Sequence, residues 1–274
     1  MARATGRPAL ADSLLREEFA EADLPEMRRW MDFARGRWSR AYDRVAAEEQ
    51  PGGLSRLLMM RAVWIPLDAR LPGIEDDIER ALAQDSTSAS GAWAALFPHR
   101  KLYTAALLSL QAGDTETGVA YADSAAALPI DSTLAPVVRN MVRTVRGEAA
   151  LRADDVPTAR AELEALEWEM APVAEHALRH LGIERAHFLR AEAAWRDGDV
   201  EAAHRWFEHG RADTEDYSLL ELRRGQVQEA LGNLERARIH YARVVEALEP
   251  ADEELIPRRD EARARLAALL EAGS

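Results

Sequence analysis

Apolar residues recur at helical spacing over most of the chain. Between Glu26 and Glu49 they lie one, three or four residues apart, at Met27, Trp30, Met31, Ala34, Trp38, Ala41, Tyr42 and Val45. Such spacing places their side chains on one face of an α-helix. Segments that combine alternating polarity with many β-branched residues are few, so a sheet is not expected. The pattern therefore predicts an all-α fold.

Proline and glycine divide residues 1–92 into four predicted helices. The breaks are Pro25, the Gln-Pro-Gly-Gly stretch at 50–53 and the turn at 72–73, and Pro66 is expected to end or kink the third helix. The predicted helices cover residues 9–22, 26–49, 54–71 and 74–84. We interpret residues 1–92 as one or two degenerate helix pairs that pack on the rest of the chain.

A recurring unit of helix, short turn and helix follows from Trp93 onward. It is clearest in residues 222–250, where small residues stand where two antiparallel helices must touch and Pro250 ends the second helix. The turn residues of four units are separated by 41, 44 and 34 residues, and they are Gly113, Asp154, Gly198 and Gly232. Each is expected to adopt the left-handed backbone that glycine favours and Asp tolerates.

This recurrence resembles the tetratricopeptide repeat, over about Trp93 to Ala272. The resemblance implies a right-handed α-solenoid of antiparallel helix pairs at 93–274, closed by a capping helix after Pro250. The segment from Ala247 onward also looks like the end of repeat regions in large bacterial signalling proteins. No kinase or regulator motif accompanies it. The implied function is a scaffold or adaptor that binds proteins or peptides without catalysing a reaction.

In such arrays the first helix of each pair lines a concave groove. Carried over by spacing, the predicted groove residues are Tyr103, Leu107, Glu148, Arg152, Phe188, Glu192, Trp195, Arg196, Gln226 and Glu229. Trp195 and Arg196 are the predicted hot spot, because Trp and Arg carry much of the binding energy at protein interfaces. An alternative stays open, in which Trp195 simply packs into the neighbouring helix pair.

Composition narrows the classes of partner and chemistry. The formal net charge is −13 and the pI about 5.1, so the chain repels nucleic-acid backbones at long range. Cysteine is absent, which excludes disulfides, thiolate catalysis and cysteine-ligated zinc. No apolar run is long enough to span a membrane, and the N-terminus has no signal-peptide pattern. With Met1 as the natural start, the expected location is the cytoplasm.

Four residues are candidates for a metal site. His176, His180, Glu184 and His187 would form a ladder on one continuous helix, with imidazole groups able to bind zinc. Gly182 is a candidate break in that helix, and the sequence HALRH lacks the glutamate of an HExxH motif. Histidines on a solvated or packed helix face are the default interpretation, so no metal or cofactor is predicted. Acidic clusters such as Glu75-Asp76-Asp77 suit helix starts and not a catalytic cleft.

The N-terminal region is rich in aromatic and methionine residues, at Trp30, Met31, Phe33, Trp38, Tyr42, Met59, Met60 and Trp64. Packing against the first repeat explains this set, and contact with a partner or a second copy of the chain is the alternative. The leading interpretation of the whole chain is a non-catalytic adaptor. The alternatives are a regulatory or sensor module of a bacterial signalling or transcription system, and a helical enzyme with an unrecognised site.

Overall fold

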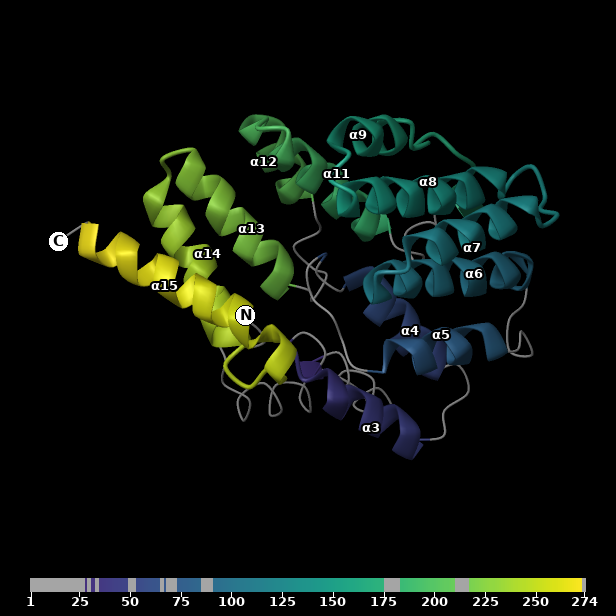
Figure 1. Ribbon diagram of the computed structural model, residues 1–274, viewed down its shortest axis with the longest axis horizontal. Coiled ribbons are helices and arrows are strands. Elements are labelled where there is room, and N and C mark those ends of the chain that lie inside the picture. The colour runs from purple at the N-terminus through teal and green to yellow at the C-terminus, as the bar shows by residue number, and fades with distance from the viewer. Residues whose placement is uncertain are drawn as a thin grey trace. The chain divides into compact units, whose positions relative to one another are not determined.

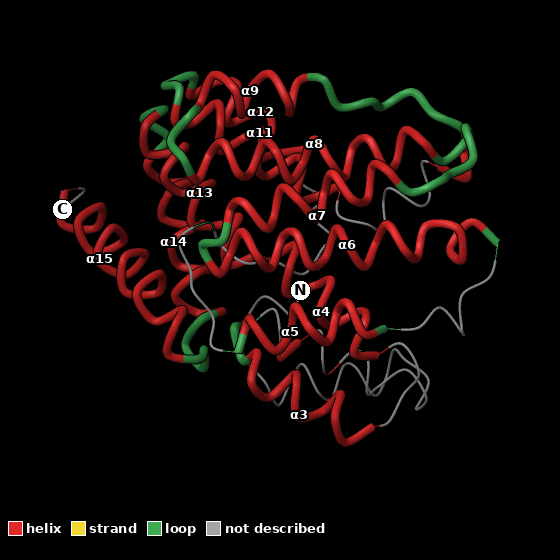
Figure 2. The backbone as a smooth tube through the Cα atoms, turned by 45° about the vertical axis from the view of Figure 1, so that its right-hand side comes forward, coloured by secondary structure: helices red, strands yellow, loops and turns green. Residues whose placement is uncertain are grey.

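In the described part of the chain, all regular structure of the computed structural model is helical (Figures 1 and 2). The predicted all-α class is therefore confirmed there. The described residues are Arg28, 31–32, 35–48, 53–64, Leu67, 73–84, 91–174, 183–209 and 217–272. Among them, a helix with the length and hydropathy of a membrane span is not found.

The helices and their bounds are α3 (Trp38–Glu48), α4 (Gly53–Trp64), α5 (Ile74–Ala83), α6 (Ala92–Ala112), α7 (Thr115–Ala127), α8 (Ala135–Arg152), α9 (Val156–Glu164), α11 (Ile183–Arg196), α12 (Val200–His209), α13 (Tyr217–Ala230), α14 (Leu234–Ala247), the 3-10 helix η2 (Glu253–Leu255) and α15 (Ile256–Ala272). Helix α4 ends before Pro66, and α5 lies within one residue of its predicted limits. The predicted helix 9–22 lies outside the described residues.

The predicted continuous helix 26–49 is wrong, because the chain turns at residues 35–37 and α3 begins only at Trp38. Gly36 has a φ of 66°, in the left-handed region. Its carbonyl oxygen accepts a hydrogen bond from the amide of Asp252 at 2.8 Å. A Cβ at Gly36 would lie only 2.5 Å from Cδ1 of Leu255. Contacts with residues more than two hundred positions away thus accompany this break, and the local pattern cannot show them.

Four consecutive helix pairs share one turn geometry. The predicted turn residues all have positive φ: 89° at Gly113, 60° at Asp154, 81° at Gly198 and 76° at Gly232. After each of them, the amide of an Asp or Asn donates to the carbonyl five residues earlier, as from Asp114 to Ser109 at 2.9 Å. This bond closes a Schellman motif, which satisfies carbonyls at the end of the first helix. The predicted left-handed turns are confirmed at all four positions.

The same Asp or Asn then precedes the second helix of each pair. Asp114, Asp155 and Asp199 each accept a hydrogen bond from the amide three residues on, at 3.0, 3.1 and 2.9 Å. These are N-caps, and they satisfy donors that the helix itself leaves free. Two successive residues therefore end one helix and start the next. They form a short connection between two antiparallel helices.

Small residues let the helices of a pair approach closely. A Cβ at Gly147 would lie 2.7 Å from Cγ of Leu163, and one at Gly225 would lie 2.4 Å from Cε1 of Tyr241. Both glycines lie in first helices, and Leu163 and Tyr241 lie in the second helices of the same pairs, α8/α9 and α13/α14. Leu163 and Tyr241 are fully buried. Each pair thus packs a large side chain of one helix against the bare backbone of the other.

The contacts divide the chain into two units, Pro51–His209 and a second one formed by Met1–Gln50 with Gly210–Ser274. In the 51–209 unit, α5 packs on α6, and α7 lies between α6 and α8 (Figure 1). In the second unit, α13 packs on α14 and α14 on α15. The packing of α5 on α6 agrees with the expectation that residues 1–92 pack on the rest of the chain, and the boundary between residues 92 and 93 stays a prediction. The right-handed solenoid stays a prediction.

We expect Gly225→Ala to destabilise the protein by about 1–2 kcal/mol, because the added methyl meets the buried Tyr241 ring. Helix propensity alone would favour alanine over glycine by about 1 kcal/mol, so the sign of the change is diagnostic. Urea unfolding followed by circular dichroism measures it. In a Tyr241→Leu background the same substitution should cost less, because the ring is gone. A gain in stability in the wild-type background would contradict the close contact.

Candidate functional site

Eight of the ten predicted groove residues lie on α6, α8 and α11, the first helices of three pairs in the 51–209 unit. We call the surface that these three helices form the inner face. Tyr103, Leu107, Glu148 and Glu192 are at most 2 % exposed. Phe188, Trp195 and Arg152 are half-buried, and Arg196 is exposed. The structure therefore places four of these eight side chains in the interior, and binding of a peptide by the set stays a prediction.

Helix α4 covers part of the inner face. It packs against α6 and α11, and its own Leu57, Leu58 and Ala62 are buried. Its last turn leaves carbonyl oxygens without intrahelical partners. Side chains of the inner face donate to carbonyls there and just beyond: Gln111 to Ala62 at 2.8 Å, Arg185 to Val63 at 3.3 Å and Arg152 to Leu67 at 2.9 Å. Tyr103 and Leu107 of the same face are buried, so neither side chain is open to a peptide in this structure.

A buried ion cluster lies beside the end of α4. Glu148 of α8 accepts two hydrogen bonds from Arg185 of α11, at 2.8 and 2.6 Å, and two from Arg152, at 3.1 and 2.8 Å. Burial by itself would raise the pKa of Glu148, but the two guanidinium groups hold that pKa below its ordinary value. The cluster joins α8 to α11 and positions both arginines toward α4. Its role in the described structure is therefore to hold helices together.

The predicted hot spot also makes intramolecular contacts. Arg196 donates to the carbonyl of Leu151 at 2.6 Å and to the carboxylate of Glu192 at 3.1 Å, which ties α11 to the end of α8. The ring of Phe188 lies 6.0 Å from that of Phe207 of α12. Trp195 is half-buried. This exposure agrees both with a contact to a partner and with packing against the neighbouring helix pair.

The two remaining groove residues lie on α13, in the second unit. Gln226 is buried; it accepts from Arg223 at 2.6 Å and donates to Glu261 of α15 at 2.7 Å. Glu229 accepts from the hydroxyl of Tyr241 at 2.6 Å and from Arg265 at 3.1 Å. Both side chains thus connect α13 to the helices that follow it.

The candidate metal ladder falls largely outside the described part of the chain. His176 and His180 are not described, and neither is the side chain of Glu184. His187 is described, and its ring stacks on Trp168 with centroids 4.9 Å apart and lies 5.8 Å from Trp206. Among the described residues, no group of three His, Asp or Glu side chains is arranged to hold a metal ion.

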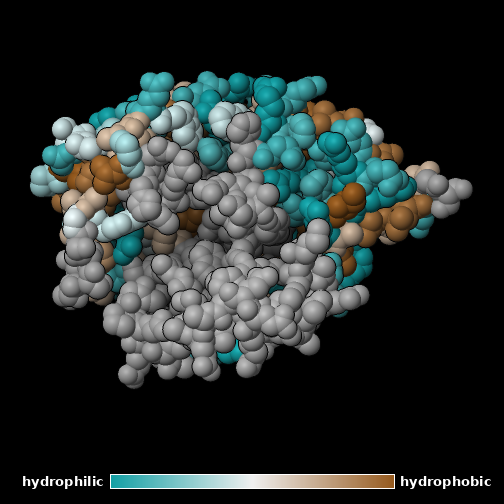
Figure 3. Space-filling model, turned by 180° about the vertical axis from the view of Figure 1, so that it is seen from behind, coloured by the Kyte–Doolittle hydropathy of each residue, from teal (hydrophilic) through white to brown (hydrophobic). Residues whose placement is uncertain are grey.

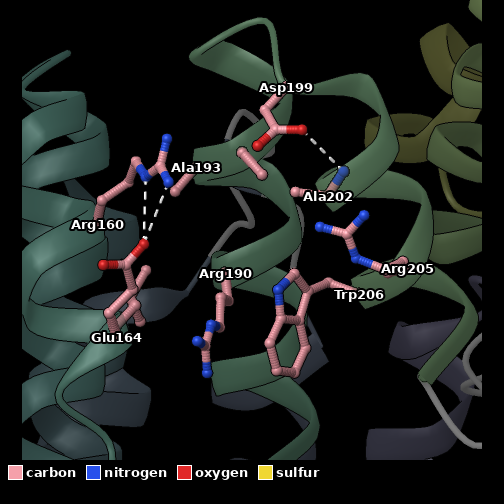
Figure 4. A pocket seen from close by; sticks show the side chains of 10 residues that line it. Arg160, Glu164, Arg190, Ala193, Asp199, Ala202, Arg205 and Trp206 are labelled. Atoms are coloured by element: carbon pink, nitrogen blue, oxygen red, sulfur yellow. Dashed lines mark hydrogen bonds and ion pairs between the residues drawn. The ribbon is translucent and has the colours of Figure 1, made fainter.

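A pocket of about 360 Å³ opens between α9, α11 and α12 in the 51–209 unit (Figure 4). Alanines of α11 and α12 line the pocket together with three arginines, two acidic residues and a tryptophan. The charged and aromatic members are Arg160, Glu164, Arg190, Asp199, Arg205 and Trp206. A volume of this size lies at the lower end of the range for small-ligand sites. It accommodates a side chain or a small anion.

Most of the charges in the pocket have partners within the protein. Arg160 donates to Glu164 at 3.2 and 3.4 Å and also binds Asp197. Asp199 is occupied as the N-cap of α12. Arg190 lies with its guanidinium carbon 3.9 Å from the ring centroid of Trp206 (Figure 4). Partial burial lowers the pKa of Arg190, and the charge of Glu164 offsets that effect only in part. The cation of Arg190 is thus held against an aromatic face in a partly desolvated place.

Sequence reasoning did not identify the pocket. Its three arginines come from three helices, so no spacing along the chain connects them. One signal was present. Trp206 stands next to Phe207, and two adjacent residues of a helix cannot both face the same core. Phe207 is indeed 1 % exposed, and Trp206 therefore faces away from the core stripe of α12.

Exposed hydrophobic side chains are scattered over the described surface. The large ones are Trp168, Val173, Leu234, Ile239 and Leu270. Figure 3 shows hydrophilic residues over much of the described surface on one face, with hydrophobic residues in smaller groups between them. Trp168 belongs to a ladder with His187, Trp206 and Arg190, which we call the aromatic ladder. Trp206 and Arg190 also line the pocket, so the aromatic ladder and the charged pocket are adjacent.

Comparisons of the chain with models of protein families, with curated proteins and with solved structures found no match. The tetratricopeptide resemblance therefore stays a prediction, and the geometry of the described residues carries the functional argument.

We expect Glu148→Gln to destabilise the protein by about 3–5 kcal/mol at pH 7, because two arginines lose their buried counterion. The pKa of Glu148 is lowered by folding, so its stabilising effect is complete above the ordinary value of 4.5. That effect is lost as the pH falls through the lower folded-state pKa. The difference between wild type and variant should therefore shrink only at acidic pH, which urea unfolding over a pH series measures.

The matched control is Asp123→Asn, which removes a carboxylate from the exposed pair with Arg146. It should cost less than about 1 kcal/mol. Equal effects of Glu148→Gln and Asp123→Asn at pH 7 would contradict the buried cluster.

Proposed function

We propose that the chain is a non-catalytic helical scaffold that binds a segment of a partner protein, as the tetratricopeptide resemblance implies. The observation that supports this most is the fourfold recurrence of one helix–turn–helix unit, with a left-handed turn residue and an Asp or Asn after it. Repeated units of this kind stack into extended surfaces that bind other proteins. The pairing also keeps side chains of successive units at fixed places for a partner to contact.

The partner's place in the 51–209 unit is the surface around the aromatic ladder. Helix α4 lies on the inner face, whereas the pocket between α9, α11 and α12 is open. Trp168 is 37 % exposed, and Trp206 and Arg190 are half-buried beside the pocket. Trp and Arg at partly desolvated positions supply much of the energy of protein interfaces. These features favour the ladder over the predicted inner-face groove as the binding surface.

Selection of random peptides displayed on phage against the folded chain tests this proposal. We expect enriched peptides that bind with dissociation constants of about micromolar, measured by isothermal titration calorimetry. Trp168→Ala should weaken their binding about tenfold or more, because it removes an exposed ring of the ladder.

Ile239→Ala is the control, because it truncates an exposed hydrophobic side chain of α14 in the second unit. Its affinity should equal that of the wild type, and circular dichroism should show both variants folded. Selection without any enriched peptide would overturn the scaffold proposal. Enriched peptides that bind Trp168→Ala and wild type alike would place the binding surface away from the ladder.

A further inference from the structure

We infer that the pocket between α9, α11 and α12 binds an anionic oxygen group of the partner segment, a carboxylate or a phosphate, with Arg190 as its main contact. This inference rests on the proposed function, because it names the chemistry of the segment that the scaffold binds. The net charge of −13 does not by itself imply a site for an anion. Such a site follows from the local arrangement of the pocket.

The pocket brings several arginines together although the chain as a whole is acidic. Three arginines face two carboxylates in its lining. Glu164 is bonded to Arg160, and Asp199 is bonded to the amide of Ala202. The contact identified for Arg190 is the π face of Trp206, and such a contact does not use the guanidinium N–H donors, which lie in the plane of the group.

The position of Arg190 makes an anion an energetically favourable occupant. Burial lowers its pKa, and Glu164 restores only part of the stabilisation that water would give the charge. An anion in the pocket would supply the missing compensation. Arginine is the side chain best suited to it, because its planar donors match both oxygens of a carboxylate or phosphate. The contact with Trp206 also limits the rotamers of Arg190 before the ligand arrives.

The aromatic ladder suggests what stands next to the anionic group. Trp168, His187 and Trp206 lie in succession, and Trp168 is partly exposed. An apolar or aromatic side chain of the partner can pack on Trp168 while its anionic neighbour enters the pocket. The occupant is therefore a peptide segment with an acidic or phosphorylated residue close to an apolar one. The pocket volume of about 360 Å³ suits one such side chain.

The first test needs no peptide. Inorganic phosphate and acetate are titrated separately into the full chain while the Nε–Hε resonances of arginines are followed by NMR. We expect a saturable shift of the Arg190 resonance and none of Arg146, which is paired with Asp123 on the surface. Arg190 unmoved by both anions would overturn the inference.

The second test uses the peptides selected on phage, each compared with a copy whose acidic residues are changed to Gln. Against wild type, the acidic peptide should bind about tenfold more tightly than the Gln copy, which is the usual effect of a hydrogen bond between charged groups. A phosphoserine copy distinguishes a phosphate from a carboxylate as the preferred group. Arg190→Gln should abolish the difference between the acidic and Gln peptides. Arg146→Gln, which removes the same charge elsewhere, should leave it unchanged.

A charge-reversal variant shows whether a loss of binding comes from the lost charge or from misfolding. Arg190→Glu should bind a Lys-substituted copy of the peptide better than the acidic original. The outcomes separate the two proposals. If peptides bind without acidic preference and Arg190→Gln has no effect, the inference fails and the scaffold proposal stands. If anions shift Arg190 but no peptide is ever selected, the pocket binds anions and the scaffold proposal fails.

Discussion

Four helix pairs, α6/α7, α8/α9, α11/α12 and α13/α14, depend on one backbone constraint, a left-handed residue directly after the first helix. At Gly113, Asp154, Gly198 and Gly232 the chain reverses through this conformation and is closed by a Schellman bond. The following Asp or Asn starts the second helix. Because the connection is so short, the second helix must run back along the first, and the two backbones are forced into contact. Glycine and large buried side chains such as Leu163 and Tyr241 fill that contact.

The packing of the 51–209 unit also depends on how its buried charges are neutralised. Glu148, Arg152 and Arg185 are costly to bury singly, but together they satisfy one another and the carbonyls near the end of α4. The arrangement turns the inner face of the 51–209 unit into a docking surface for a helix of the same chain. Arg190 differs from these arginines, because it rests on Trp206 at the edge of an open pocket. Because of this contrast, we propose a structural role for the inner face and a binding role for the pocket.

The features that the sequence predicted well are local ones. The left-handed turns and the helices around them follow from residues a few positions apart, and they were found where expected. The features it missed join distant segments. Gly36 breaks the helix 26–49 where it meets Leu255, and Glu148 is buried where Arg185 and the end of α4 meet it. The groove residues were assigned from a first-helix position alone, which cannot reveal that α4 covers that face. The pocket was missed for the same reason, since Arg160, Arg190 and Arg205 come from three helices.

We propose that α4 stays on the inner face while a partner binds at the pocket. Hydrogen exchange of the chain with and without a saturating selected peptide measures this directly, because each helix reports its own protection. We expect slower exchange in α9, α11 and α12 and unchanged exchange in α4. Faster exchange in α4 upon binding, with α9 and α12 unaffected, would show that the peptide displaces α4 from the inner face, and it would contradict the account.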